Sequence, residues 1–178
     1  MSPGSTFSIA GRVFAPILMS SLAAVSASAG PRPTSLLGWD TAAVERARAG
    51  AARRLGKPEC QSVLSDFKDA EGRTPLQNLE PWQLGAPDYL QVIRFMDGSS
   101  IQNCRQTSVQ LTTTPGLPTV YVCPAGLAAA GSRFAQTEIR NSSLAEFMII
   151  HEMLHTLGLG ENPPSTFEIT EQVKKRCR

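Results

Sequence analysis

The sequence lacks a marked excess of either charge. Its 178 residues include 17 Lys or Arg and 15 Asp or Glu, which gives a net charge of +2. Strong binding to nucleic acid or to an acidic membrane surface needs concentrated positive charge, so neither partner is expected. Internal repeats are also missing, and low complexity is confined to the Ala-rich stretch 127–130. One globular domain is therefore the simplest organisation.

Long apolar runs are scarce too, and the main candidate stands near the N-terminus. Arg12 precedes the apolar stretch 13–25, and Ala27-Ser28-Ala29 follows as an A-x-A cleavage pattern. These are the three parts of a secretory signal, and the run is shorter than the about 20 residues that span a bilayer. We expect a signal peptide at residues 1–29 and a mature domain at residues 30–178. The mature protein is expected to be a secreted (periplasmic or extracellular) monomer without membrane contact.

No cysteines stand in a C-x-x-C arrangement, which argues against a structural zinc cluster. The four cysteines are widely spaced, at Cys60, Cys104, Cys123 and Cys177. In an oxidising compartment, two disulfides are their expected use. Four cysteines allow three pairings, and the spacing does not choose among them. A free Cys60 thiol acting on a metal ion is a less favoured alternative.

The first helix is predicted at roughly residues 41–55. Asp40 is a suitable N-cap, strong helix formers follow it, and Pro58 marks the end. The next stretch, 60–87, mixes short apolar groups with polar residues and is predicted to form short helices and loops. The sequence leaves open whether residues 30–57 are a removable pro-segment or part of the domain.

Three apolar or β-branched runs predict strands. The run 89–96 ends at Asp97-Gly98, as expected for a strand followed by a turn. The runs 109–114 and 119–123 lie on either side of the Pro- and Gly-containing segment 115–118. This arrangement predicts a β-hairpin with a loop longer than a two-residue turn.

The last third of the chain returns to helical patterns. Ser143 and Glu146 form a capping-box pattern before an apolar stripe, and Gly158 is placed to end that helix. A second capping-box pattern, from Ser165 to Glu168, predicts a final helix. We therefore predict a small α+β domain. Its short mixed sheet packs on the N-terminal helix and on the helix that ends at Gly158.

Only two histidines occur, and both lie in the segment His151-Glu152-Met153-Leu154-His155. Residues four apart on a helix project from the same face, so both imidazoles can bind one metal ion. H-E-x-x-H on a helix is typical of a zinc site whose glutamate takes a proton from water. We predict Zn²⁺ as cofactor, His151 and His155 as its ligands and Glu152 as catalytic base.

A catalytic zinc ion normally has three protein ligands, so a third is needed. Glu161 is the favoured candidate because Gly158 turns the chain shortly before it. Glu168 is the runner-up, and its predicted place in a capping box gives it an ordinary structural role.

The segment from His151 to Glu161 reads H-E-x-x-H-x-x-G-x-x-E. It resembles the motif of the metzincin zinc peptidases, which ends in His or, in snapalysin-like enzymes, in Asp. The likeness covers these eleven residues, and no methionine follows Glu161 where metzincins have a methionine turn. The stretch 157–170 also looks like that of uncharacterised bacterial secreted proteins. The metzincin resemblance implies a reduced zincin-like fold and a zinc metalloendopeptidase acting on peptide or protein substrates.

Two other functions stay open at this point. The chain could be a zinc hydrolase for a non-protein amide or a cell-wall peptide, or a secreted protein in which zinc only stabilises the fold. A closed site with four protein ligands would favour the second alternative. Tyr89 and Tyr121 are the only tyrosines, and neither is assigned as a donor to a reaction oxyanion.

Overall fold

The structure is a computed structural model that describes residues 35–36, 38–125 and 131–178. The predicted signal peptide and the Ala-rich stretch 127–130 lie outside the described residues. The α-helices are α1 (Gly38–Leu55), α2 (Pro58–Gln61), α3 (Pro75–Leu79), α4 (Ala86–Val92), α5 (Arg133–Arg140), α6 (Ser142–Thr156) and α7 (Thr166–Arg176). The 3₁₀ helices are η1 (Ser62–Ser65), η2 (Glu80–Trp82) and η3 (Gln102–Arg105), and the strands are β1 (Arg94–Asp97), β2 (Leu111–Thr113) and β3 (Thr119–Val122).

Helices combined with one small mixed sheet confirm the predicted α+β class. The strand order is β1-β3-β2, with β1 parallel and β2 antiparallel to β3. The register pairs Arg94 with Thr119 and Leu111 with Val122, so the predicted hairpin is confirmed. Because β3 lies in the middle, β2 has one edge without a strand partner among the described residues. In the part of the chain that the structure covers, no helix has the length and apolar character needed to cross a bilayer.

The prediction of a strand over 89–96 was wrong in its first half. Residues 86–92 form α4, and β1 begins only at Arg94. Gly85 precedes this helix, Pro87 lies in its first turn and Asp88 is an acidic residue near its N-terminus, all of which favour a helix start. A short apolar run suits a buried helix as well as a strand. Helix α5 was not predicted, although Ser132 caps it by accepting a hydrogen bond from the Ala135 amide.

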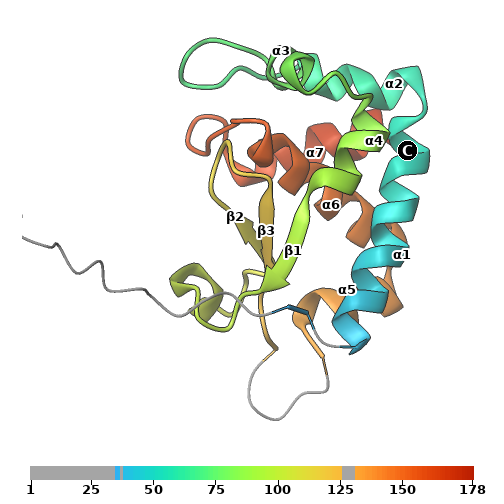
Figure 1. The fold of residues 1–178 in the computed structure, drawn as a ribbon, viewed down its shortest axis with the longest axis vertical. Helices are drawn as coiled ribbons and strands as arrows, with labels where there is room; N and C mark the ends of the chain where they lie inside the picture. Colours follow the sequence, from blue (N-terminus) through green and yellow to red (C-terminus); the bar gives the residue numbers. More distant parts are fainter. Residues whose placement is uncertain (1–34, 37, 126–130) are drawn as a thin grey trace, which may run out of the picture. The chain divides into compact units, whose positions relative to one another are not determined.

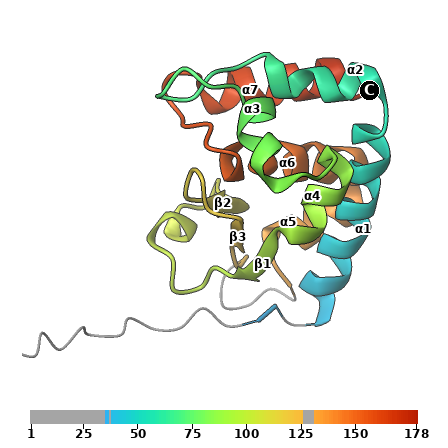
Figure 2. The same cartoon turned by 45° about the horizontal axis from the view of Figure 1, so that its top comes forward.

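The hydrophobic core lies mainly between α1 and α6. Figures 1 and 2 show α6 between α1 and the sheet, and α6 contacts all three of these neighbours, α1, β2 and β3. The buried side chains of α1 and of the middle of α6 are Ala43, Val44, Ala47, Ala51, Leu55, Ile149, Ile150, Met153 and Leu154. Each large apolar side chain buried in this way contributes about 1.5–3 kcal/mol. The first helix therefore packs as part of the fold in the full chain.

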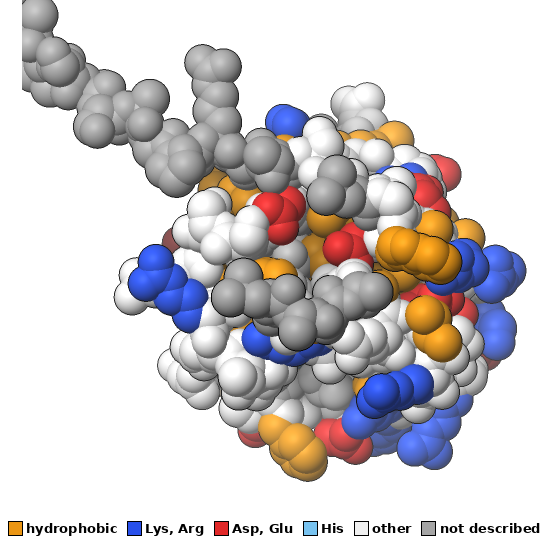
Figure 3. All heavy atoms as spheres, turned by 90° about the horizontal axis from the view of Figure 1, so that it is seen from below, with side chains coloured by type: hydrophobic (Ala, Val, Ile, Leu, Met, Phe, Trp, Pro, Cys, Tyr) orange, Lys and Arg blue, Asp and Glu red, His pale blue; other side chains and the backbone are white. Residues whose placement is uncertain are grey.

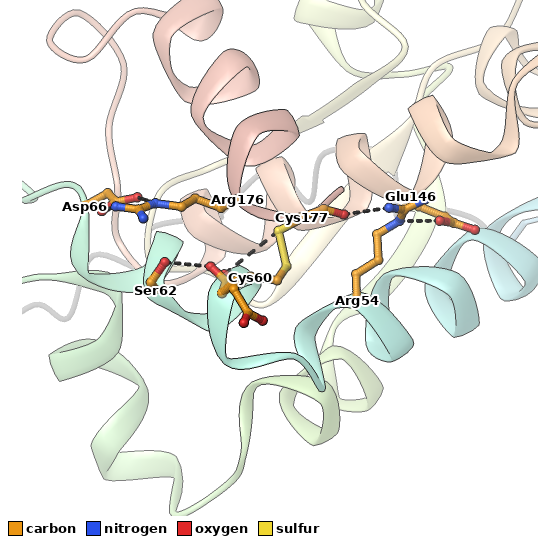
Figure 4. Close-up of a disulfide and its surroundings, with 8 residues drawn as sticks. Arg54, Cys60, Ser62, Asp66, Glu146, Arg176 and Cys177 are labelled. Atoms are coloured by element: carbon orange, nitrogen blue, oxygen red, sulfur yellow. Dashed lines mark hydrogen bonds and ion pairs between the residues drawn. A yellow bond between two sulfur atoms is a disulfide. The ribbon is translucent and has the colours of Figure 1, made fainter.

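The capping box predicted at Ser143 does not form. Helix α6 starts two residues earlier, with Asn141 in place of Ser143 as the N-cap, and the Asn141 side chain accepts from the Leu144 amide at 3.0 Å. Ser143 and Glu146 instead bind Arg54 of α1, with 2.5 Å from Arg54 Nε to Glu146 Oε2. Ser143 and Glu146 thus connect α6 to α1 through Arg54 (Figure 4). The charged guanidinium of Arg54 is a stronger partner for the Glu146 carboxylate than the local backbone amide.

The four cysteines form two disulfides, Cys60–Cys177 and Cys104–Cys123, as predicted in number. Cys60 is therefore not a free thiol near a metal ion. The first bridge ties the end of α7 to α2, and the Cys177 carbonyl also accepts from Arg54 Nη1 at 2.6 Å (Figure 4).

A second contact holds α7 from the side of η1. Asp66 accepts hydrogen bonds from Gln172 and Arg176, at 2.6 Å and at 2.8–2.9 Å. Burial alone would raise the pKa of Asp66, but these donors and the positive charges of α7 outweigh it and lower the pKa. Together with the disulfide, this carboxylate fixes the position of α7 on the rest of the fold.

On the face drawn in Figure 3, basic side chains occur beside acidic ones and among uncharged ones. This agrees with the net charge of +2.

Candidate metal site

The two histidines lie one turn apart on α6 and are buried, with exposed fractions of 6% for His151 and 5% for His155. Their Nε2 atoms are 3.0 Å apart, and the rings are nearly perpendicular, with an interplanar angle of 70°. Helical periodicity alone places them on one face. The burial of α6 from Ile149 to Thr156 then encloses them in the protein.

The glycine stop predicted at Gly158 is confirmed. Gly158 has φ of +96°, its amide donates to the His155 carbonyl, and the Leu159 amide donates to the Leu154 carbonyl. This pair of hydrogen bonds is a Schellman motif, which reverses the chain direction at a helix end. Side chains other than hydrogen are disfavoured at this φ, so the turn depends on glycine.

Hydrogen bonds from Asn78 hold the turn at Gly158 in place. Asn78 Nδ2 donates to the Leu157 carbonyl and to Asp69 Oδ2, both at 2.7 Å. Burial raises the pKa of Asp69, but the bonds from Asn78 and from two backbone amides outweigh it and lower the pKa. A Cβ atom at Gly158 would lie 2.9 Å from Asn78 Nδ2, so close packing is a second reason for glycine.

The chain that leaves this turn brings Glu161 to the histidines. Glu161 Oε1 lies 3.2 Å from His155 Nε2 and 3.8 Å from His151 Nε2. In a tetrahedral site with bonds of about 2.0–2.1 Å, the ligand atoms are about 3.3 Å apart. The triangle of the three donor atoms has a circumscribed radius of about 2.0 Å, so one point can lie at bonding distance from all three. The group could therefore hold a metal ion.

Backbone contacts orient the second imidazole. His155 Nδ1 lies 2.6 Å from the Leu159 carbonyl oxygen. A carbonyl can only accept, so Nδ1 is the donor and the Nε2 lone pair of the neutral ring faces the site. A hydrogen bond of this kind on the far nitrogen is typical of metal-binding histidines.

Helix α7 contacts the other two members of the group. Thr170 Oγ1 lies 3.1 Å from His151 Nδ1, and the Thr166 side chain interacts with the Glu161 carboxylate and lowers its pKa. Sequence reasoning missed both threonines. Their four-residue spacing on a predicted helix was visible, but nothing in the sequence indicated which element that helix face contacts.

Charge and burial set the protonation of the group. Burial lowers the pKa of His151 to about 4, the neighbouring imidazole of His155 acts in the same direction, and Glu161 opposes both. Burial raises the pKa of Glu161, but the hydrogen bond from Thr166 and the charges of the two histidines outweigh it and lower the pKa. At neutral pH His151 is therefore neutral and Glu161 is ionised, which are the forms that bind metal.

Glu152 lies beside the group and is almost fully buried, with an exposed fraction of 8%. Its Oε2 atom has no hydrogen-bond partner among the described residues. Burial raises the pKa of Glu152 to about 8, and the charge of Glu161 acts in the same direction. A cation held by the three donors would favour the ionised form instead. A carboxyl group buried without a partner is a mark of a functional position.

All four residues line one cavity of about 590 Å³. Its other walls come from the segment before and along β2, from η3, from α6 and from α7: Asn103, Gln106, Ser108, Val109, Gln110, Leu111, Thr112, Thr113, Pro115, Met148, Thr166 and Thr170. None of the described lining residues is Lys or Arg. The walls are therefore neutral, and the charged side chains are those at the donor group.

The remaining sequence candidates lie elsewhere. The Glu168 carboxylate accepts from the Ser165 amide and hydroxyl at 2.8 Å, so the second predicted capping box is confirmed. Tyr89 donates to the Thr156 carbonyl from inside the core, and neither Tyr89 nor Tyr121 lines the cavity. The side chains available as hydrogen-bond donors there are amides and hydroxyls.

Comparisons with known proteins add no relative. No protein-family model matches the chain, and no curated protein and no solved structure matches it either.

Exchanging each glutamate candidate for alanine separates the two roles. Glu161→Ala removes one of three donor atoms and is expected to weaken metal binding by at least about 100-fold, as losing a ligand costs more than losing an outer contact. Glu168→Ala removes the N3 side chain of a capping box and is expected to lower the melting temperature slightly, with little change in zinc affinity. Titration against a chromogenic chelator and thermal melting measure both effects. Stronger metal loss in Glu168→Ala would contradict this assignment.

Proposed function

We propose that the chain is a secreted zinc metalloendopeptidase. The observation that carries the proposal is the placement of a buried carboxylate, Glu152, beside a three-donor group in one cavity. Two imidazoles and one carboxylate form the ligand set of a catalytic rather than a structural zinc site, because a fourth position stays open. Glu168 does not close the site, since its carboxylate is bound to Ser165.

The chain's own residues have distinct roles in the proposed reaction. His151, His155 and Glu161 hold the ion, which would polarise a substrate carbonyl and lower the pKa of a water molecule at the open position. Glu152 takes the proton of the attacking water on its carboxylate and passes it to the leaving amine. The buried position of Glu152 keeps bulk water away from this proton transfer.

The cavity walls favour a peptide substrate. The segment 108–113 lines the cavity and includes β2, whose outer edge has no strand partner among the described residues. A free strand edge can bind an extended peptide through backbone hydrogen bonds. A non-protein amide would use the same donors but not this edge.

The absence of Lys and Arg from the described lining residues favours cleavage within a chain. Removal of C-terminal residues requires a positive group that binds the terminal carboxylate. The neutral walls around the donor group and Glu152 offer none.

Export is part of the proposal. Two disulfides join the described cysteines, and disulfides persist in oxidising compartments. The signal pattern at residues 1–29 supports the same location.

Metal removal tests the proposal directly. The full chain, expressed with its N-terminal segment and recovered after export, should contain about one zinc ion per molecule. It should cleave casein and internally quenched peptides, lose this activity with 1,10-phenanthroline and regain it on addition of Zn²⁺. Zinc-free protein purified with zinc present would contradict metal binding. Zinc binding without cleavage of any peptide would contradict the peptidase and leave a non-protein substrate or a structural ion.

A further inference from the structure

Helix α7 lies against the donor group, although it supplies none of the three donor atoms. Ile169 and Val173 are fully buried and anchor one face of the helix in the core. Thr166 and Thr170, also four residues apart, lie on a neighbouring face and line the cavity. Thr170 of this pair therefore contacts His151, and Thr166 interacts with Glu161.

The Thr170 hydroxyl contacts His151 at Nδ1, the ring nitrogen that would carry the proton when Nε2 binds a metal. His151 binds a metal through Nε2 only if that nitrogen carries no proton, so Nδ1 must carry it. An Nδ1 proton needs an acceptor in a buried site, and the Thr170 oxygen at 3.1 Å is the partner that the structure provides. In the zinc-bound form the Thr170 hydroxyl accepts this proton, so its removal would leave a buried N–H group without a partner.

The second contact, between Thr166 and Glu161, involves a side chain that is more exposed than those of the histidines. Glu161 lies on the segment between α6 and α7, and its side chain is 43% exposed, whereas those of the histidines are 6–8% exposed. An exposed glutamate has several rotamers, and ordering it costs conformational entropy. The Thr166 side chain lines the same cavity and interacts with the Glu161 carboxylate, which favours the rotamer that points Oε1 at the two histidines.

Helix α7 can position Thr166 and Thr170 because contacts at its C-terminal half fix the helix on the rest of the fold. The Cys60–Cys177 disulfide, the bonds of Asp66 to α7 and the bond from Arg54 to the Cys177 carbonyl all lie at its C-terminal half (Figure 4). The Ser165 capping box defines the first turn, which contains Thr166. The two hydroxyls are thus held on a rigid element.

We propose that Thr170 and Thr166 are positioning residues for the metal site, with Thr170 accepting from His151 Nδ1 in the metal-bound form and Thr166 orienting the Glu161 carboxylate. This inference rests on the proposed function only in that the donor group binds zinc. It makes α7 part of the metal site, although the H-E-x-x-H motif and its eleven-residue extension end before this helix begins.

The test measures zinc affinity of the full chain by competition with a chromogenic chelator. Thr170→Val and Thr166→Val keep the side-chain shape and remove the hydroxyl, and each should weaken affinity by about 10- to 100-fold, the usual effect of losing an outer-shell partner. Thr170→Ser and Thr166→Ser keep the hydroxyl and should retain most of the affinity. Thr137→Val, in the half-buried helical position of α5 outside the cavity, serves as control and should bind as the wild type does.

Two further readouts separate positioning from stability. The melting temperature of the zinc-free valine variants should stay close to that of the wild type, because Thr166 is exposed and Thr170 is only half-buried. In long-range ¹H–¹⁵N spectra of the zinc-loaded protein, the His151 Nδ1 proton should exchange slowly in wild type and faster in Thr170→Val. Wild-type affinity in both valine variants would overturn the inference while zinc binding stands, and equal losses in the serine variants would overturn it too. A wild type that binds no zinc would instead contradict the proposed function.

Discussion

Glu152→Gln is expected to keep the bound zinc and to lose hydrolysis by at least about 10²–10⁴-fold, the usual contribution of a general base. Glutamine has the same size as glutamate, so the buried position stays filled. Its amide cannot take a proton from water at neutral pH. Since Glu152 Oε2 has no partner among the described residues, the substitution breaks no hydrogen bond there, and the fold should be unaffected.

Initial rates on a quenched peptide, with zinc content measured on the same sample, check this result. Glu171→Gln is a matched control, because Glu171 is on the surface of α7 and pairs with Lys174 outside the cavity. The control should have wild-type rates. Unchanged turnover in Glu152→Gln would exclude Glu152 as the base, and loss of zinc in that variant would make it a ligand.

His155→Ala is expected to abolish zinc binding at micromolar zinc. Its Nε2 lies 3.0 Å from His151 Nε2 and 3.2 Å from Glu161 Oε1, so it is the donor nearest to both others. Its removal leaves two donors and also deprives the Leu159 carbonyl of its hydrogen-bond donor. Two donors cannot form the three-ligand site that a catalytic zinc ion requires.

Ligand-dependent stability gives an independent measurement of the same loss. A site that binds only the folded state adds about 2.7 kcal/mol when free zinc is 100 times the dissociation constant. Wild type should therefore melt at a higher temperature with zinc, and His155→Ala should melt at one temperature with and without it. A variant that still gains stability from zinc would show that the ion binds elsewhere. Near-ultraviolet circular dichroism verifies that the variant remains folded.

Local sequence patterns predicted much of the candidate site. The four-residue spacing of His151 and His155 places both on one face of any helix, because this follows from the helix repeat and needs no tertiary contact. Gly158 ends that helix for an equally local reason, the positive φ of the turn. Ser165 and Glu168 form their predicted cap because both partners are within one turn. The role of Glu161 as a zinc ligand and the reaction itself stay predictions.

Other patterns were local in appearance but were changed by distant partners. Ser143 and Glu146 match the same capping rule as Ser165 and Glu168, yet Arg54 binds them both. The apolar run 89–96 divides between α4 and β1, because the pattern of so short an apolar run fits a helix as well as a strand. Such outcomes depend on residues far away in the sequence.

The sequence by itself thus determined the α+β class, the hairpin, the use of the cysteines as two disulfides and the order of the histidines and glutamates along the chain. Only the tertiary structure decided the pairings Cys60–Cys177 and Cys104–Cys123, the approach of Glu161 to the histidines and the contacts of Thr166 and Thr170. The physical reason is the distance along the sequence between the residues that interact. Helix faces, caps and turns follow from residues within a few positions, whereas disulfide pairing and the outer contacts of a site require segments brought together by burial of the common core.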